Sequence, residues 1–180
     1  MAENHKIVGA ILAPMLLTYI IINVATTRPN DLLKGLSDEP EITTSIKSAK
    51  IDRKQALVNF FKKYNSPLEN HVDTFIRVAD SYNLDYRLLP AISCIESSCG
   101  KKLITDSYNP FGWGIYGNNV IRFKNFDEAI FKVGEGIHKN YVAKGFDTPE
   151  KIAPIYTPPS HKHWLSSVNY FMSQMADSNQ

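Results

Sequence analysis

The sequence predicts a mainly α (α+β) protein, in which a helical domain with a small β-hairpin or loop region follows one transmembrane helix. An uncharged apolar run covers residues 7–25, and apolar residues recur at helical spacing from Ile51 onward. Glycine, asparagine and aromatic residues concentrate in residues 101–124, which is typical of turns. The length of 180 residues suffices for one domain with additional chain. We therefore expect an anchor or signal sequence in residues 1–25, a flexible linker in 26–50 and a folded domain in 51–180.

The apolar run of residues 7–25 decides the expected compartment. As a helix it would be about 28 Å long at about 1.5 Å per residue, close to a hydrocarbon core of about 30 Å. A cleaved signal peptide is the alternative, although its apolar region is usually roughly 7–15 residues long and no A-x-A site follows this run. We expect an uncleaved, single-pass membrane anchor with its N-terminus in the cytoplasm. Cleavage would instead make the protein secreted, and both alternatives place the domain outside the cytoplasm.

The charge balance argues against nucleic acid as a partner. The net charge of +2 is too small for a concentrated basic face. His161 and His163 invite a zinc interpretation, but no Glu or Cys stands beside them at ligand spacing. We therefore expect no metal and no other cofactor. Oligomeric state has no signature in the sequence.

Helix start and stop signals divide the folded domain. The first helix is expected to start at Ile51, and Ser66-Pro67 opens the second. Asp85 is the expected N-cap of a third helix that ends near Gly100. A short hairpin is expected to close through residues 120–123. Later helices are expected to start near Asn125, with Glu128 completing a capping box, near Thr148-Pro149 and near Ser160.

Glu96 in the third helix is the candidate catalytic acid. It lies at i+4 from Ile92 and at i+7 from Leu89, on the edge of that helix's apolar stripe. Partial desolvation there favours the neutral carboxyl group and raises its pKa. A carboxyl group that keeps its proton near neutral pH can protonate a glycosidic oxygen. Position alone favours instead a Glu that caps the helix end or pairs with Lys101 or Lys102.

The segment after Glu96, residues 108–116 (YNPFGWGIY), combines aromatic side chains with glycines. Exposed aromatic rings stack on the apolar faces of sugars, and glycine lets a backbone approach a ligand closely. Core packing is the alternative for Phe111, whereas Trp113 and Tyr116 are better candidates for a cleft. We expect this part of the chain to bind substrate through Ser97, Tyr108, Asn109, Phe111, Trp113 and Tyr116.

Residues 95–100 (IESSCG) followed by residues 108–112 (YNPFG) resemble the E-S-x-x-G … N-x-F-G pattern of bacterial cell-wall glucosaminidases. These are the mannosyl-glycoprotein endo-β-N-acetylglucosaminidase-like enzymes of the lysozyme superfamily. Residues 84–89 also resemble lytic transglycosylases of that superfamily, and residues 126–130 and 152–156 fit its downstream helices. The resemblance implies a lysozyme-like fold, peptidoglycan glycan strands as the substrate, and Glu96 as the general acid. The expected reaction is cleavage of β-1,4 linkages between N-acetylglucosamine and N-acetylmuramic acid.

The second catalytic group is less defined. Asp106 is the only acidic residue between Ser97 and Asn125, and it is either the second carboxylate or a turn residue. Without a second carboxylate, the 2-acetamido group or the muramic C6 hydroxyl of the substrate would act as nucleophile, the latter as in lytic transglycosylases. Tyr156 resembles the family tyrosine near the reacting sugar, and packing beneath Pro158 and Pro159 is its alternative. A non-catalytic wall-binding module on the same fold is the remaining alternative function.

Cys94 and Cys99 flank Glu96, and their pairing is open from the sequence. On an unbroken helix their Cα atoms would lie roughly 8–9 Å apart, beyond the usual disulfide reach of about 7 Å. A disulfide therefore requires the helix to unwind by Cys99, which Gly100 permits. An oxidising exterior favours the disulfide, and buried free thiols are the alternative.

Overall fold

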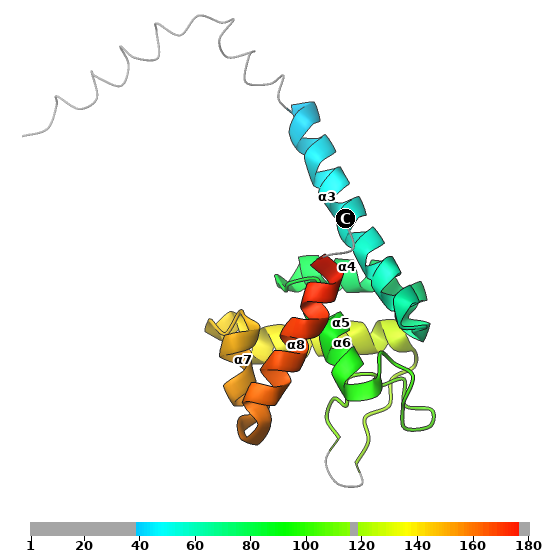
Figure 1. The fold of residues 1–180 in the computed structure, drawn as a ribbon, viewed down its shortest axis with the longest axis vertical. Helices are drawn as coiled ribbons and strands as arrows, with labels where there is room; N and C mark the ends of the chain where they lie inside the picture. The colour runs from blue at the N-terminus through cyan, green and yellow to red at the C-terminus, as the bar shows by residue number, and fades with distance from the viewer. Residues whose placement is uncertain (1–38, 116–118, 177–180) are drawn as a thin grey trace, which may run out of the picture. The chain divides into compact units, whose positions relative to one another are not determined.

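The computed structural model describes residues 39–115 and 119–176 (Figure 1). The described α-helices are α3 (Glu39–Lys63), α4 (Val72–Tyr82), α5 (Leu88–Ser97), α6 (Phe126–Asn140), α7 (Pro149–Tyr156) and α8 (His161–Ala176). Short 3-10 helices are η1 (Pro67–His71), η2 (Val142–Lys144) and η3 (Pro158–Ser160). The mainly α class is therefore confirmed for the described part of the chain.

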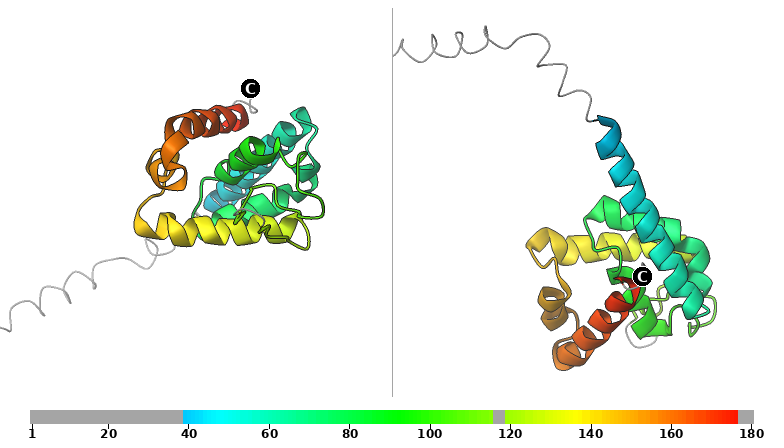
Figure 2. Two further views of the ribbon diagram at one scale, coloured as in Figure 1. Left: turned by 90° about the horizontal axis from the view of Figure 1, so that it is seen from below. Right: turned by 45° about the horizontal axis from the view of Figure 1, so that its top comes forward.

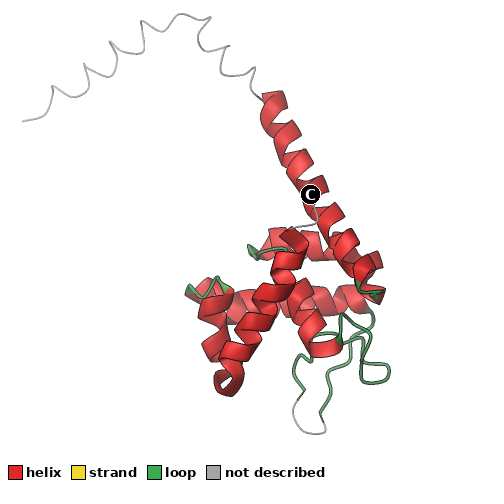
Figure 3. Cartoon of the chain, in the orientation of Figure 1, coloured by secondary structure: helices red, strands yellow, loops and turns green. Residues whose placement is uncertain are grey.

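The segment between α5 and α6 is irregular. Its described residues contain no strand, and Asn119 alone forms an isolated bridge (Figure 3). The hairpin expected through residues 120–123 is therefore wrong for the residues that the structure describes. The backbone N–H of Phe123 donates instead to the carbonyl of Ser107 at 2.9 Å. This bond ties the end of the segment to its beginning and leaves a closed loop.

The chain divides into two compact units, residues 1–46 and 47–180. In the first unit the structure describes only residues 39–46, which belong to α3. Residues 39–50 are thus helical where a flexible linker was expected. Pro40 lies in the first turn of α3, where its missing N–H needs no partner, and no Pro or Gly follows it until Pro67.

The expected anchor, residues 7–25, lies outside the described residues. No helix in the described ranges is both long and apolar enough to cross a bilayer.

The second unit has one hydrophobic core, in which aromatic rings from separate segments meet. The ring centroid of Phe75 in α4 lies 5.3 Å from that of Phe61 in α3 and 6.5 Å from that of Phe111. All three side chains are buried. Phe111 belongs to the irregular segment, so burial of its ring in the core fixes residues 108–115 against the helices.

Helix α5 has a central position in this unit. It packs against α8, while α4 packs against α6 and α7 against α8. In the left view of Figure 2, α5 (green) lies between α8 (orange to red) and α6 (yellow). Helix α5 is therefore flanked by later elements of the chain.

The sequence predicts one helix cap correctly and another wrongly. Asn125 was correctly expected to start α6: its Oδ1 accepts from the N–H of Glu128 at 2.9 Å. Asp85 was wrongly expected to cap α5, which begins at Leu88 after Arg87. The Asp85 carboxylate accepts instead from the backbone and side chain of Arg87. Pro90 then falls in the first turn of α5, where a proline is tolerated.

We expect Asp127→Asn to lower stability at neutral pH by about 1 kcal/mol, because Asp127 joins α6 to the preceding elements. Its Oδ1 accepts from Thr74 Oγ1 (2.6 Å) and lies 2.9 Å from His71 Nδ1. Desolvation alone would raise the pKa of Asp127, but the hydrogen bonds from Thr74 and His71 outweigh it and lower this pKa.

A lowered folded-state pKa stabilises the protein above the unfolded-state pKa of about 3.9, and this contribution is lost as pH falls through the folded value. Urea unfolding of wild type and Asp127→Asn at pH 7 and pH 3 checks this. The stability difference between them should be smaller at pH 3. A difference that is equal at both pH values would contradict the ionic role of Asp127, and Asp52→Asn at an exposed position of α3 is the control.

Candidate active site

Glu96 lies one residue before the end of α5 and beside the irregular segment. The residues around it in the helix are mostly buried, whereas the Glu96 side chain is exposed. Gly112 approaches it closely, because a Cβ placed on Gly112 would lie 3.5 Å from Glu96 Oε2. Gly112 also has a φ of +59°, a left-handed conformation that favours glycine. The glycine thus allows the segment backbone to lie against the carboxyl group.

Glu96 opens onto a cavity of about 550 Å³. Its wall is formed by α5, the segment around Trp113, the C-terminal end of α6, the end of α7 and the beginning of α8. The described lining residues are Glu96, Phe111, Gly112, Trp113, Gly114, Ile115, Asn140, Tyr141, Tyr156, Thr157 and Trp164. The volume lies within the range of sites that hold a small ligand or part of a polymer.

Burial raises the pKa of Glu96 above that of an ordinary carboxyl group. The carboxyl group is open to the cavity, yet the surrounding protein removes part of its hydration, and this disfavours the charged form. No charged group contributes to the shift, and Glu96 is the only acidic or basic residue among the described residues that line the cavity. The expectation of a raised pKa from partial desolvation therefore agrees with the structure.

Three aromatic side chains form the wall contributed by the later helices. The ring centroid of Tyr156 lies 5.0 Å from that of Trp164 and 6.2 Å from that of Tyr141. Trp164 is buried, and its Nε1 has no hydrogen-bond partner among the described residues. Together with Trp113, these rings give the cavity the apolar planes that can stack on sugar rings.

Asn109 organises the segment that carries Trp113. Its Nδ2 donates to the carbonyls of Trp113 (2.9 Å) and Ile121 (3.2 Å), and its Oδ1 accepts from the N–H of Trp113 at 3.0 Å. The side chain is buried and does not line the cavity. Asn109, expected to bind substrate, therefore shapes the cavity wall from behind.

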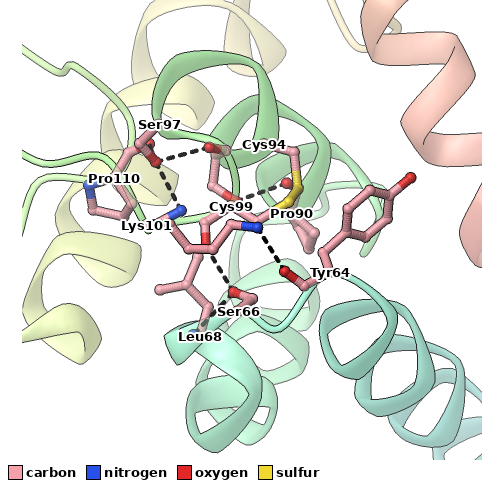
Figure 4. The surroundings of a disulfide bond; sticks show 11 residues. Tyr64, Ser66, Leu68, Pro90, Cys94, Ser97, Cys99, Lys101 and Pro110 are labelled. Atoms are coloured by element: carbon pink, nitrogen blue, oxygen red, sulfur yellow. Dashed lines mark hydrogen bonds between the residues drawn. A yellow bond between two sulfur atoms is a disulfide. The ribbon is translucent and has the colours of Figure 1, made fainter.

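Ser97 also has a structural position. Its hydroxyl lies 2.9 Å from the carbonyl of Ser93 and 2.8 Å from that of Pro110, and it accepts from the N–H of Gly100 at 2.9 Å (Figure 4). It is buried and absent from the cavity wall. The hydroxyl connects the C-terminal end of α5 to the segment that bears Gly112.

Cys94 and Cys99 form a disulfide. The helix ends at Ser97, and the next residues have left-handed backbone conformations, with φ of 53° at Ser98 and 60° at Cys99. The chain therefore reverses before Cys99, and its Cα lies 3.7 Å from that of Cys94. This resolves the alternatives left open by the sequence in favour of the disulfide.

The other expected site residues divide into three groups. Tyr156, Trp113 and Phe111 join Glu96 at the cavity, although Phe111 is buried in the core. Tyr108 is exposed, packs edge-on against Phe126 and does not line the cavity. Asp106 is exposed and also absent from the wall. Tyr116 lies outside the described residues.

Several cavity residues were missed by sequence reasoning. Tyr141, Trp164, Asn140 and Thr157 line the cavity but were not among the expected site residues. In the described ranges, no three His, Cys, Asp or Glu side chains are grouped so as to hold a metal ion.

No family model and no curated protein sequence matches this chain.

We expect Gly136→Ala to reduce the activity proposed below about tenfold while the protein remains folded. A Cβ at Gly136 would lie 2.5 Å from Trp113 Cζ2 and 3.0 Å from Cη2, so the indole must move within the cavity wall. Alanine itself favours the helix by about 1 kcal/mol, which offsets the steric cost. Steady-state kinetics of the reaction proposed below and thermal unfolding measure the two effects.

Gly145→Ala is the matched control. Nothing lies within 4 Å of a Cβ there, but the φ of +86° is unfavourable for alanine. This variant should lower the melting temperature without changing the activity of the folded protein. Equal activity losses in the two variants would contradict the role of Trp113.

Proposed function

We propose that the chain is a peptidoglycan glycosidase that cleaves β-1,4 linkages between N-acetylglucosamine and N-acetylmuramic acid. The observation that carries the proposal is the partly desolvated carboxyl group of Glu96, the only carboxyl group among the described residues of a cavity walled by aromatic rings. The sequence resemblance to cell-wall glucosaminidases, which includes Glu96 and Tyr156, supports the same assignment.

In the proposed reaction, Glu96 acts as general acid. Its raised pKa keeps the carboxyl group protonated at a pH at which an ordinary carboxyl group has lost its proton. Glu96 donates this proton to the glycosidic oxygen as the bond to the anomeric carbon breaks. The resulting carboxylate then accepts a proton from the attacking water, which restores the acid. The rings of Trp113 and Tyr156 would position the sugars on either side of the bond.

The nucleophile is proposed to come from the substrate. A retaining hydrolase has a second carboxylate about 5–5.5 Å from the acid, and an inverting one about 6.5–9.5 Å. Among the described cavity residues Glu96 is the only carboxylate, and Asp106 does not line the wall. The 2-acetamido oxygen of the substrate could therefore attack the anomeric carbon and form a cyclic intermediate that water opens.

That Glu96 is the only carboxylate among the described cavity residues also favours a second candidate function, that of a lytic transglycosylase. There the muramic C6 hydroxyl attacks the anomeric carbon, the leaving sugar takes the proton of Glu96, and the carboxylate takes the hydroxyl proton. The product is a 1,6-anhydro sugar, and no water is consumed.

Product analysis tests the proposal and separates the two candidates. Purified sacculi are incubated with the full chain, and the soluble muropeptides are analysed by mass spectrometry. Reducing ends indicate hydrolysis, and 1,6-anhydro ends, lighter by one water, indicate transglycosylation. Binding of the chain to sacculi without release of any muropeptide would overturn the enzymatic proposal and favour a wall-binding module.

We further propose that the enzyme works outside the cytoplasm, tethered to the membrane through residues 7–25. The Cys94–Cys99 disulfide supports an oxidising compartment, and the uncharged length of the segment supports the anchor.

A further inference from the structure

The chain reverses immediately after Glu96 through a left-handed turn. Ser98, Cys99 and Gly100 have φ values of 53°, 60° and 78°. Only the last of these is glycine, so two residues with a Cβ occupy a conformation that is unfavourable for them. Such a turn persists only where its surroundings fix it.

A disulfide between residues on either side of Glu96 fixes this turn covalently. The disulfide joins Cys94, two residues before Glu96 in the helix, to Cys99, three residues after it, and closes residues 94–99 into a ring. Both cysteines are buried. The backbone on either side of Glu96 is therefore held by one bond.

Hydrogen bonds attach this ring to the rest of the unit. On one side, Ser66 Oγ donates to the carbonyl of Cys99 at 2.7 Å (Figure 4). On the other side, the hydroxyl of Ser97 lies 2.8 Å from the carbonyl of Pro110, two residues before Gly112. The ring thus connects the segment before α4 to the backbone that lies against the Glu96 carboxyl group.

We propose that the Cys94–Cys99 disulfide is the positioning element of Glu96, which it holds at the cavity wall against Gly112 by closing the turn that follows α5. Cys94 and Cys99 act through Glu96 and touch no substrate. This inference rests on the proposed function, because it assigns the disulfide to the same catalytic acid.

Reduction removes this constraint without removing any side chain. Two electrons and two protons convert the disulfide into two thiols, and dithiothreitol supplies them while it becomes a cyclic disulfide. The hydrogen bonds of Ser66 and Ser97 then hold the strained turn alone. As the turn relaxes, the Glu96 carboxyl group moves away from Gly112 and gains hydration.

The pH dependence of the reaction reports the movement of the Glu96 carboxyl group, because few other titratable groups lie close enough to alter the pKa of Glu96. Tyr141 of α6 and Tyr156 of α7 are the titratable residues that share the cavity with Glu96 in the described ranges. The segment that carries Gly112 and the beginning of α8 contribute no titratable or charged group to the described wall. A shift in the titration of Glu96 therefore measures its hydration rather than a changed charge partner.

The test compares the full chain, oxidised and reduced, with the C94S/C99S variant. We expect the reduced protein and the variant to lose about 10- to 100-fold in kcat, with KM within about twofold because the aromatic wall is unchanged. The alkaline limb of the pH–rate profile should move to lower pH, since greater hydration lowers the pKa of Glu96. Dithiothreitol should have no effect on C94S/C99S.

Circular dichroism shows whether each form is folded. A folded variant with the kcat and the alkaline limb of the wild type would overturn the inference. If C94S/C99S does not fold, the reduced wild type is measured at temperatures at which it is folded. A reduced wild type that is unfolded at every temperature would show that the disulfide serves folding rather than positioning, and this also overturns the inference.

A direct titration separates this inference from the proposed function. The pKa of the Glu96 carboxyl group is measured by carbon-13 NMR in the oxidised and reduced protein, without substrate. A lower value after reduction supports positioning even if no peptidoglycan is cleaved, in which case only the proposed function fails. An unchanged value in an enzyme that Glu96→Gln inactivates would refute the positioning role alone.

Discussion

Glu96→Gln should lower the rate of muropeptide release from purified sacculi by about 100- to 10,000-fold. Glutamine has nearly the shape of glutamic acid and can occupy the same position beside Gly112, but it has no carboxyl proton to donate. Because the glycosidic oxygen must be protonated as its bond breaks, kcat should fall while binding to sacculi persists. Soluble muropeptides measured by liquid chromatography give the rate, and sedimentation with sacculi gives the binding.

Glu135→Gln is the matched control. Glu135 is an exposed residue of α6 that pairs with Lys132 at 3.3 Å, and it does not line the cavity. Such a surface pair contributes at most about 1 kcal/mol, so this variant should release muropeptides at the wild-type rate. If Glu96→Gln retained the same rate as Glu135→Gln, the assignment of Glu96 as the acid would be wrong.

Glu96→Gln should lower the activity without lowering the stability of the folded protein. Burial raises the folded-state pKa of Glu96, so the stability associated with the protonated form is present below the unfolded-state pKa and is lost as pH rises through the folded value. Above the folded-state pKa, glutamine removes the cost of a partly desolvated negative charge. Glu96→Gln should therefore unfold at an equal or higher temperature than the wild type, which distinguishes lost chemistry from lost folding.

The helices were predictable where local chemistry determines them. The apolar spacing of α4 and α6, and the Asn125 cap, depend on residues within a few positions of one another, and these features agree with the structure. The start of α3 was missed because Pro40 was taken as a linker residue, although proline fits the first turn of a helix. The local sequence does not distinguish a proline in a linker from a proline in the first turn of a helix.

The site was only partly predictable because its members come from separate parts of the chain. Glu96 was found from its position on an apolar stripe together with the motif resemblance, and Trp113 from the composition of its segment. Trp164 lies far along the chain and reaches the cavity through the packing of α8 on α5. Ser97 and Asn109 were assigned to substrate because polar residues in such a motif suggest binding, whereas burial gives them backbone partners. Only the tertiary structure distinguishes a polar side chain that binds substrate from one that bonds to buried backbone groups.

Asn109→Ala should destabilise the protein by about 2–4 kcal/mol and also reduce the activity of the molecules that remain folded. The Asn109 side chain satisfies the N–H and the carbonyl of Trp113 and the carbonyl of Ile121. Alanine leaves these backbone groups without that partner in a largely buried loop, and the desolvation cost of such groups is not recovered elsewhere. Because the same bonds set the position of Trp113 in the cavity wall, kcat/KM should fall together with stability.

Asn109→Asp tests whether the donating amide of Asn109 is required, and Asn169→Ala is the control for the loss of a surface asparagine. Aspartate keeps an acceptor for the N–H of Trp113 but replaces the donating amide with an oxygen that faces two carbonyls, so it should be nearly as damaging as alanine. Asn169 donates to Glu150 at 3.1 Å on the surface, and its replacement should change stability by less than about 1 kcal/mol. Guanidinium unfolding and kinetics on sacculi measure both effects. If Asn109→Ala kept wild-type stability, the loop would be fixed by Phe111 in the core alone, and the structural role assigned to the Asn109 side chain would be wrong.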